Sequence, residues 1–591
     1  MDKNVTRVFD LLKYSLDKPK TEFVSGKVAG KWVNYSTDYF CKTVDNLSRG
    51  LVKMGIGKGG RVAVMSHNRP EWNIADFAAN QLGAYQIPLY PTLSGHDIEF
   101  ILRDAEISII FVSSEELYTK LQPCVAKVNP EIKIFTFDSF QNANHWSTLL
   151  EEGEKSSGIN LEEYHAAITP DDLLTIIYTS GTTGTPKGVM LTHNNLVSNF
   201  KNSAIILPPN LEKGLSFLPL SHIFERMIIY LYIYVRIDVY YAESMETIVA
   251  DIQHVKPQVF STVPRLLEKV YDKILEKGKE LKGLKKQIFF WALKLAENFD
   301  LNSSAWYNFR LNIARKLVFK KWQAALGGNI GVIISGGAAL NSRLARIFWA
   351  AGMSVFEGYG LTETSPVITV NHLTGIMFGT VGELIKGAEL KIAEDGEILV
   401  RGDNVMKGYY NRPDLTAKEI DVEGWFHTGD IGELIDGRFL KITDRKKEMF
   451  KTAGGKYVAP QILENKYKES SFIEQIMVLG ENRKFPSALI VPNFGILKKW
   501  ATKHNLIYSS ELELIKNPNV ETKIQEEIDR FGADFGKWER VKRFALLATE
   551  WSIDGGELTP KLSLKRKVIN EKNEVLINKI YTDAESFKPQ H

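Results

Sequence analysis

Two hydrophobic patterns alternate along the first 150 residues of the chain. After Ser36, apolar residues recur at spacings of four, three and four, as one face of an amphipathic helix requires, at Phe40, Val44, Leu47 and Leu51. The compact apolar run from Arg61 to Met65 predicts a short buried strand. A helix that begins at Pro70 and runs toward Leu82 then leads to a second strand over Tyr85 to Leu89.

A third round of the same pattern places a helix over His96 to Asp104 and a strand over Ile107 to Val112. Repeated β-α units favour an α/β fold in which helices cover mostly parallel sheets. At 591 residues the chain is too long for one hydrophobic core, so about two to four structural units are expected.

The stretch from Tyr178 to Val189 concentrates glycines, short hydroxylated residues and one lysine. Such a loop suits a polyphosphate, because Gly181, Gly184 and Gly188 let the backbone turn several N–H groups toward one anion and Lys187 adds a positive charge. A flexible Gly/Thr linker is the alternative interpretation.

The sequence around this loop argues against the linker. The apolar run Leu173 to Tyr178 predicts a buried strand before the loop, and Gly188 to Leu191 is long enough only for a short strand after it. Thr192 is then expected to cap a helix from His193. An ordinary P-loop NTPase, in which the lysine leads directly into a helix, is therefore disfavoured.

Composition excludes few functions. A net charge of +3 with 44% hydrophobic and 25% charged residues is typical of a globular protein, and no nucleic-acid-binding motif is present. Cys41 and Cys124 lack metal-ligand spacing and suit a reducing cytoplasm. Met1 to Lys20 lacks the apolar core of a signal peptide, and the most apolar stretch, Met227 to Val235, is about half a bilayer-spanning helix.

Residues 268–327 are expected to form a helical, basic insertion. Its cations and aromatics are Lys273, Lys277, Lys279, Lys282, Lys285, Lys286, Phe289, Phe290, Trp291, Trp306, Phe309, Phe319 and Trp322. A solvated helical face explains the lysines. The alternative is a surface that touches anionic lipid while the aromatic residues sit near its interface.

Further along the chain, glycines again combine with polar residues at Ile333 to Ala339, Phe356 to Thr364 and Gly424 to Asp430, and Asp444-Arg-Lys-Lys447 follows. With the glycine-rich loop, and in this order, these motifs resemble those of the AMP-forming adenylating superfamily of acyl-CoA synthetases, luciferase and peptide-synthetase adenylation domains. The segment Leu218 to Arg226 resembles the family segment in which a histidine or aromatic residue borders the acyl site, and Thr262 to Leu267 is similar to the version found in its long-chain fatty-acid–CoA ligases.

The resemblance implies a large N-terminal domain of β-α units over residues 1–443, a hinge at 444–447 and a smaller mobile α+β domain over 448–591. The hinge would let one site run two steps, because a lysine needed for adenylation must leave before a thiol enters.

The resemblance also implies functional residues. Those expected to act in catalysis are Lys187, His222, Thr362, Glu363, Lys451 and Lys561. Those expected to hold the nucleotide are Thr179, Ser180, Gly181, Thr182, Thr183, Gly184, Gly337, Ala338, Ala339, Glu357, Gly358, Tyr359, Gly360, Asp430, Arg445 and Lys447. Glu363 and Thr183 are the expected Mg²⁺ ligands, because ATP phosphates need a hard cation and that cation prefers oxygen. Glycines beside Tyr359 would let its ring approach a purine.

The adenylation lysine is the weakest match to the family. The chain reads Leu558-Thr-Pro-Lys-Leu-Ser-Leu-Lys-Arg566, and one alignment selects Lys561 whereas another places Ser563 at that position. Lys561 is preferred, with Lys565 as the alternative.

The function that the resemblance implies is an AMP-forming ligase that joins a long-chain fatty acid to CoA, using ATP and Mg²⁺. An acyl-carrier-protein ligase, an adenylating enzyme for another acid and a catalytically silent relative are the alternatives. The expected location is cytoplasmic, with peripheral contact at the inner membrane surface if the basic insertion touches lipid. His222 is the candidate for deprotonating the CoA thiol, whose ordinary pKa is about 8.5.

Overall fold

A computed structural model describes residues 4–180, 186–244, 246–446, 448–553, 555–559 and 564–586 of the chain. It divides into two compact units. Unit 1 comprises Met1–Lys391, Leu399–Thr428 and Leu434–Leu440, and unit 2 comprises Ile392–Ile398, Gly429–Glu433 and Lys441–His591. The long segment of unit 2 thus begins three residues before the expected hinge, and two short stretches of the preceding chain join it.

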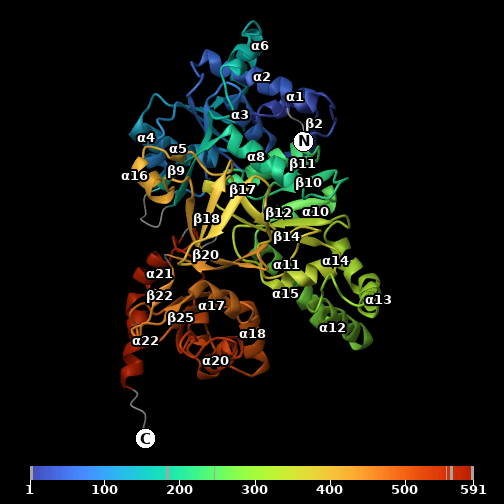
Figure 1. Cartoon of the computed structure of the whole chain (residues 1–591), viewed down its shortest axis with the longest axis vertical. Helices are drawn as coiled ribbons and strands as arrows, with labels where there is room; N and C mark the ends of the chain where they lie inside the picture. The colour runs from blue at the N-terminus through green and yellow to red at the C-terminus, as the bar shows by residue number, and fades with distance from the viewer. Residues whose placement is uncertain are drawn as a thin grey trace. The chain divides into compact units, whose positions relative to one another are not determined.

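The first β-α repeats form an eight-stranded sheet in unit 1 (Figure 1). β3 pairs in parallel with β4 and β5, which confirms the expected parallel core. β8 and β9 pair antiparallel at one side of it. In sheet order, the strands are β19 (Gly408–Tyr409), β9 (Pro186–Thr192), β8 (Leu173–Ser180), β4 (Tyr85–Leu89), β3 (Arg61–Met65), β5 (Ile109–Val112), β6 (Lys133–Thr136) and β7 (Asn144–His145).

A second sheet of unit 1 is parallel from β11 through β10, β12 and β13 to β14, and antiparallel from β14 to β16. Its strands are β16 (Glu383–Leu384), β15 (Val367–Val370), β14 (Ser354–Gly360), β13 (Val332–Ser335), β12 (Val259–Thr262), β10 (Lys213–Ser216), β11 (Asp238–Tyr241), β1 (Val24–Val28) and β2 (Lys31–Tyr35). The division between the units runs through β17 (Ala388–Ile392), β18 (Glu397–Gly402), β20 (Phe426–Ile435) and β21 (Phe439–Arg445).

The helices of unit 1 begin where the sequence predicts them. α2 (Thr37–Lys53) is capped by the Ser36 side chain, and its predicted apolar face is fully buried. α3 (Pro70–Asn80) and α4 (Gly95–Asp104) follow their predicted strands. The other early helices are α1 (Asp10–Leu16), α5 (Glu115–Val128), α6 (Ser147–Lys155), α7 (Leu161–Ala166), α8 (His193–Ala204), α9 (Ile223–Tyr234) and α10 (Ile248–Val255).

A buried ion pair ties α3 and α9 to β8. The Arg226 guanidinium donates to both carboxylate oxygens of Asp76 and to the Thr175 hydroxyl, 2.8 Å away, and both charged side chains are fully buried. The apolar stretch Met227 to Val235 lies mostly within α9 and is buried in the core. No helix in the described part of the chain is long and apolar enough to cross a membrane.

Most of residues 264–325 are helical. They form α11 (Pro264–Glu280), α12 (Gly283–Glu297), α13 (Ala305–Ala314), a π-helix (Arg315–Phe319) and α14 (Lys320–Ala325). Figure 1 shows α12 and α13 side by side in unit 1. The aromatic residues differ in exposure: Phe289, Phe319 and Trp322 are buried, Phe290 and Trp291 are half-buried, and Trp306 and Phe309 are exposed.

Unit 2 is an α+β unit with its own hydrophobic core, as its sequence resemblance implies. β24 (Ile473–Leu479) pairs antiparallel with β25 (Ser487–Pro492), which pairs in parallel with β26 (Arg543–Leu546). A separate hairpin joins β22 (Phe450–Lys451) to β23 (Tyr457–Val458). The helices are α17 (Pro460–Tyr467), α18 (Phe494–Lys503), α19 (Glu511–Leu514), α20 (Pro518–Gly532), α21 (Arg566–Lys572) and α22 (Glu574–Ser586).

Both cysteines are buried and form no disulfide.

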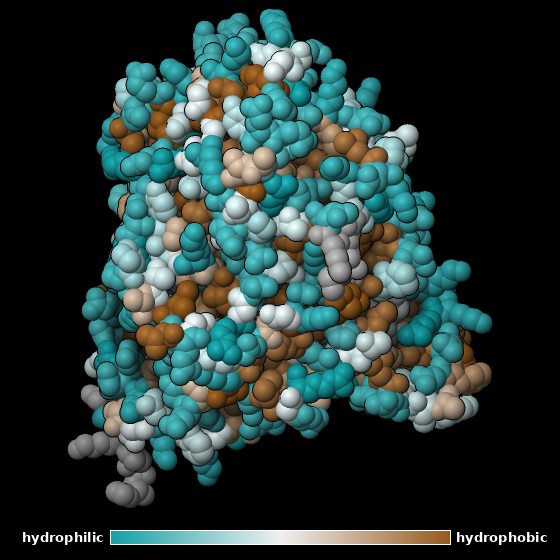
Figure 2. All heavy atoms as spheres, turned by 45° about the horizontal axis from the view of Figure 1, so that its top comes forward, coloured by the Kyte–Doolittle hydropathy of each residue, from teal (hydrophilic) through white to brown (hydrophobic). Residues whose placement is uncertain are grey.

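On the face drawn in Figure 2, hydrophilic residues predominate and hydrophobic residues lie between them. Two further elements of unit 1 are α15 (Ser342–Ala350) and α16 (Pro413–Glu419).

Candidate functional site

The expected phosphate loop joins β8 to β9 in an antiparallel hairpin. Thr179 lies opposite Lys187 in this pair, and Ser180 lies opposite Pro186. Beyond the hairpin, the Thr192 side chain accepts a hydrogen bond from the Asn195 N–H and caps α8. The expected strands on either side of residues 181–185 and the helix that follows them are therefore confirmed. The loop residues expected to cradle phosphate lie outside the described residues: Gly181, Thr182, Thr183 and Gly184.

The structural role of Gly188 differs from the expected one. It does not turn the backbone, because it lies inside β9 opposite Tyr178. A Cβ at this position would lie 2.9 Å from Ile176 and 3.2 Å from both Tyr178 and Tyr410. The glycine therefore makes room for side chains of the sheet that supports the loop.

Tyr409 lies between the loop lysine and the expected magnesium ligand. The Lys187 ammonium is 5.1 Å from the centre of the Tyr409 ring. The Tyr409 hydroxyl donates a 3.0 Å hydrogen bond to Glu363 Oε1. Burial and the Glu363 carboxylate raise the pKa of Tyr409 far above its ordinary value, so the hydroxyl stays a donor at neutral pH. One cation and one carboxylate thus share a single aromatic side chain.

The two-residue strand β19 brings Tyr409 to this position. It pairs antiparallel with β9, and the Tyr410 N–H donates 2.7 Å to the Gly188 carbonyl. The Met406 N–H donates 2.8 Å to the Glu363 carbonyl and so attaches the same segment to the second motif. Sequence reasoning missed Tyr409, because a two-residue strand carries no hydrophobic period.

Thr362, Glu363 and Thr364 form a 3₁₀ turn directly after β14. Thr362 is buried and Glu363 is half-buried. Gly360 allows this turn, since a Cβ there would lie 1.7 Å from the Pro366 carbonyl oxygen. Glycine is thus required at this position because the backbone at the start of β15 approaches it closely. Access to the half-buried Tyr359 ring is not the only reason for it.

Glu357 holds the turn that precedes α15. Its Oε1 accepts a 2.9 Å hydrogen bond from the Leu340 N–H, next to the exposed residues Gly337, Ala338 and Ala339. Gly337 has φ +81°, which L side chains rarely adopt. Burial raises the pKa of Glu357 to about 8. The carboxyl group therefore joins the segment Gly337 to Ala339, which is expected to hold the nucleotide, to β14, which carries Gly358.

In unit 2 the structure brings Asp430 and Arg445 together. Arg445 Nε lies 3.3 Å from Asp430 Oδ1, with the aspartate buried and the arginine side chain 54% exposed. The neighbouring Asp444 is buried, and its Oδ1 accepts from the Arg445 N–H at 2.6 Å. Burial raises the pKa of Asp444 to about 7, with the nearby Glu448 carboxylate contributing.

The expected catalytic residue Lys451 belongs to an exposed hairpin. Lys451 lies on β22, and its ammonium is 4.6 Å from the centre of the Tyr457 ring on β23. Gly455, with φ +74°, makes the turn between the strands. Lys447 and Lys561 lie outside the described residues, as does Ser563.

A half-buried arginine fixes the chain just after the candidate adenylation lysines. Arg566 donates to both carboxylate oxygens of Glu464 at 2.7 Å and to Glu448 at 3.0 Å. The Lys565 N–H donates 2.7 Å to the Glu557 carbonyl. Arg566, which directly follows Lys565, thus anchors α21 within unit 2.

His222 is the N-cap of α9. Its Nδ1 accepts a 3.0 Å hydrogen bond from the Phe224 N–H, which requires the neutral ring to carry its proton on Nε2. In this state Nε2 is a donor. The imidazole can accept a proton only at Nδ1, and only if the helix cap is broken.

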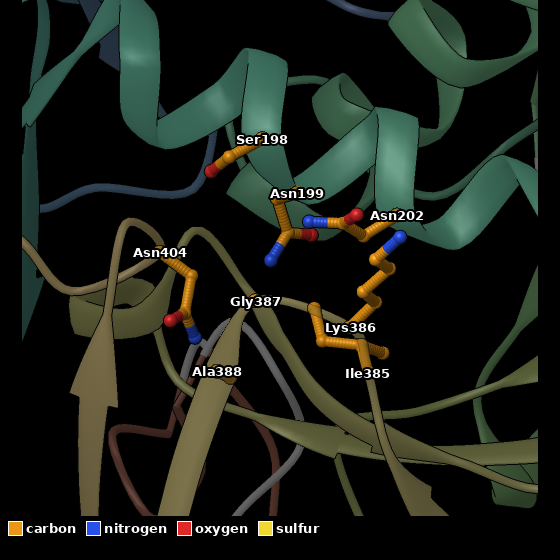
Figure 3. Close-up of a pocket in the computed structure, with 8 residues that line it drawn as sticks. All are labelled: Ser198, Asn199, Asn202, Ile385, Lys386, Gly387, Ala388 and Asn404. Atoms are coloured by element: carbon orange, nitrogen blue, oxygen red, sulfur yellow. The ribbon is translucent and has the colours of Figure 1, made fainter. Parts of the chain in front are cut away.

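The hollow drawn in Figure 3 contains none of the expected site residues. Amide side chains of α8, including Asn199 and Asn202, face the segment 385–388 across about 150 Å³. Part of this volume is open solvent, and the enclosed space is far smaller than the roughly 300 Å³ of an ordinary ligand pocket. Asn199 Nδ2 instead donates 2.9 Å to the Val367 carbonyl, so the hollow lies beside a structural contact.

The described residues contain no group of three or more His, Cys, Asp and Glu side chains that could enclose a metal. Glu363 nevertheless suits Mg²⁺ carried by a nucleotide, because one or two carboxylates and the phosphates commonly complete such a site. The half-buried carboxylate oriented by Tyr409 fits that requirement.

An α/β unit with a glycine-rich hairpin loop, followed by an α+β unit with its own core, is the organisation that the sequence resemblance implies for an adenylate-forming enzyme. Comparison with protein families supports this class. The AMP-binding enzyme family matches residues 14–410, and the AMP-binding enzyme C-terminal domain matches residues 448–585. This protein therefore belongs to the AMP-binding enzyme family.

Among curated proteins, the chain is similar to long-chain-fatty-acid–CoA ligases. It is 33% identical to FadD15 of Mycobacterium bovis over 97% of this chain and 96% of that protein. It is also 33% identical to long-chain-fatty-acid–CoA ligase 5 of Rattus norvegicus over 94% of this chain and 85% of that protein.

Solved structures show the same fold at lower identity. The adenylation domain of a carboxylate reductase from Mycobacterium chelonae is 21% identical with a TM-score of 0.74, over 98% of this chain and 93% of that chain. The anthranilate CoA ligase AuaEII is 15% identical with a TM-score of 0.72, over 96% of this chain and 97% of that chain.

Proposed function

We propose that this protein is a long-chain fatty-acid–CoA ligase that uses ATP, forms an acyl adenylate and transfers the acyl group to CoA. The observation that carries the proposal is the similarity to such ligases across 97% of the chain, through both units. The cluster of Lys187, Tyr409 and Glu363 supports the first half of the reaction, because it places a cation and a carboxylate beside the phosphate loop.

In the first step, an oxygen of the fatty-acid carboxylate attacks the α-phosphorus of ATP. A phosphorus–oxygen bond to the acyl group forms, and the bond to the bridging oxygen of pyrophosphate breaks. Lys187 would offset charge on the phosphates, and Thr362 would hold the α-phosphate. No general base is needed, since the carboxylate is already ionised, so positioning and electrostatics supply the acceleration.

Mg²⁺ bound with ATP would neutralise charge on the phosphate oxygens during this step. Glu363 and Thr183 would hold it. Tyr409 would keep the Glu363 carboxylate oriented by the hydrogen bond that it donates to Oε1.

Unit 2 would supply the remaining groups. Asp430 would accept hydrogen bonds from the ribose hydroxyls, with Arg445 beside it. Lys561 would contact the carboxylate and the α-phosphate, and rotation about residues 444–447 would then replace it with the segment that carries Lys451.

In the second step, the CoA thiolate attacks the acyl carbonyl carbon, a thioester forms and AMP leaves. The hydrogen bond from the Phe224 N–H makes His222 Nε2 a donor. We therefore propose that His222 borders the acyl site as a donor, and that a role as thiol base would require the helix cap to open first.

The test is nucleotide analysis of the purified protein with ATP, Mg²⁺ and palmitate, with and without CoA. We expect catalytic formation of AMP, and not of ADP, only when palmitate and CoA are both present. AMP formation with another acid but not with palmitate would overturn the substrate assignment. Absence of AMP with every carboxylic acid tested would overturn the ligase proposal.

We also infer a cytoplasmic location with peripheral contact at the inner membrane surface. The support is the pair of unbridged cysteines and the basic helical insertion.

A further inference from the structure

An apolar stripe runs along one exposed face of α13 and the π-helix that continues it. Its members recur at spacings of three, four and four, which keeps them on one side of a helix. Their exposed fractions are 67% for Trp306, 57% for Phe309, 37% for Ile313 and 49% for Leu317. The Trp306 and Phe309 rings stack with their centres 5.6 Å apart. We call these four residues the α13 stripe.

The opposite face of the same helices is buried and rigidly attached. Leu311, Val318 and Phe319 pack inward, and the Phe319 ring lies 4.9 Å from that of Trp322. Arg315 Nε donates 2.9 Å to the Ala350 carbonyl at the end of α15. The exposure of the stripe therefore comes from a fixed helix and not from a loose one.

The helical segment that carries the stripe has charges of a single sign. Residues 301–328 contain five cationic side chains and no acidic one: Arg310, Arg315, Lys316, Lys320 and Lys321. Lys316, Lys320 and Lys321 are exposed, whereas Arg315 turns inward. At the lower right of Figure 2, where Figure 1 places α12 and α13, hydrophobic residues lie beside hydrophilic ones.

We propose that the α13 stripe docks this protein on an anionic lipid bilayer. Trp306 and Phe309 enter the headgroup region, and the flanking lysines contact anionic lipid headgroups. Each cation near such a surface strengthens binding roughly fivefold. A second copy of the chain fits the stripe poorly, because a symmetric contact would place the same cations against one another.

The choice of lipid as partner rests in part on the proposed function, since a long-chain acid partitions into bilayers and its ligase gains by binding there. The test of docking does not use catalysis. Failure of the proposed function and failure of the docking proposal are therefore separate results.

The experiment is co-sedimentation of the full chain with vesicles of phosphatidylcholine alone, or with roughly one-third phosphatidylglycerol, at low and high salt. The wild type is expected to bind the anionic vesicles, and salt is expected to weaken binding. Trp306→Ser with Phe309→Ser should weaken binding at least fivefold. Lys316→Glu with Lys320→Glu should weaken it at least tenfold, and only on anionic vesicles.

Matched controls come from unit 2. Ile507→Ser removes a side chain that is 93% exposed, and Lys503→Glu with Lys516→Glu makes the same change in charge. Both should bind within twofold of wild type. Far-UV circular dichroism and the thermal unfolding midpoint of the stripe variants should match those of the wild type, which shows that they fold.

Three outcomes would overturn the proposal. The first is that the wild type does not sediment with anionic vesicles. The second is that a folded stripe variant binds these vesicles as tightly as the wild type. The third is that sedimentation velocity without vesicles shows Trp306→Ser with Phe309→Ser converting a dimer to a monomer, which would make the stripe a subunit contact.

Discussion

Replacing Tyr409 by phenylalanine removes one hydroxyl group from the cluster beside the phosphate loop. The ring remains, so the contact with the Lys187 ammonium 5.1 Å away is kept. The 3.0 Å hydrogen bond to Glu363 Oε1 is lost. A hydrogen bond to a charged group contributes about 1.5–3 kcal/mol, so a carboxylate that acts only when oriented should lose roughly 10- to 100-fold in kcat/KM for ATP.

The assay is ATP–pyrophosphate exchange with palmitate at several Mg²⁺ concentrations, which isolates the adenylation step. If the hydroxyl orients Glu363 toward the metal, Tyr409→Phe should also raise the Mg²⁺ concentration needed for half-maximal rate. Tyr409→Leu, which removes the ring too, should lose a further roughly two- to fivefold because it also loses the cation–π contact.

Tyr410→Phe is the matched control. Its hydroxyl accepts from Arg61 Nη2 at 3.3 Å, and its side chain makes no hydrogen bond to Glu363 that the structure describes, so less than a threefold change is expected. A double-mutant cycle completes the test, because Tyr409→Phe should have little effect in a Glu363→Gln background. The reasoning is refuted if Tyr409→Phe is as active as wild type across the Mg²⁺ range, or if its effect is undiminished beside Glu363→Gln.

Three further predictions concern buried carboxyl groups and the adenylation lysine. Burial raises the pKa of Glu357 from 4.5 to about 8, so this group should lower the unfolding free energy as pH rises through this window, by at most about 4–5 kcal/mol. Glu357→Gln should remove that contribution, measured by urea denaturation. Burial also raises the pKa of Asp444, so its carboxyl group should lower the unfolding free energy as pH rises from 3.8 to about 7, and Asp444→Asn should remove that contribution. Asparagine is the suitable replacement because its side-chain oxygen can still accept the hydrogen bond from the Arg445 N–H. Lys561→Ala should slow acyl-adenylate formation far more than Lys565→Ala, measured by pyrophosphate exchange.

Each of these has a result that contradicts it. Glu116→Gln, at an exposed position, is the control for the two pH experiments and should leave the slope unchanged. A stability difference between wild type and Glu357→Gln that does not change between pH 5 and 8 would mean that Glu357 is ionised in the folded protein. A larger loss in Lys565→Ala than in Lys561→Ala would transfer the adenylation role to Lys565.

Sequence alone determined the elements whose causes are local. The spacing that predicts α2 is the spacing of residues that touch on one helix face, and Thr192 caps α8 through an N–H three residues away. The order of the glycine motifs also led to the family, because each motif is short and contiguous. Helix spacing and short motifs can both be identified in the sequence without knowing which distant segments are in contact.

Glycines show where local reasoning stops. Gly188 and Gly360 were expected to free the backbone or a neighbouring ring, yet each makes room for another strand or its side chains. At Gly188 a Cβ would meet Tyr410, which is distant in the sequence. At Gly360 a Cβ would meet the carbonyl of Pro366, which is near in the sequence but reaches this position only through the turn. Neither contact can be predicted from the motif alone.

The tertiary structure decided which residues share a site. Tyr409 meets Lys187 and Glu363 only because β19 pairs with β9, and a strand of two residues has no period to detect. In the same way, Trp306 is exposed and Phe319 buried although both are aromatics of one basic helical segment. Composition and spacing specify which residues can form a helix or strand, whereas long-range packing specifies their neighbours, and the chemistry proposed here depends on those neighbours.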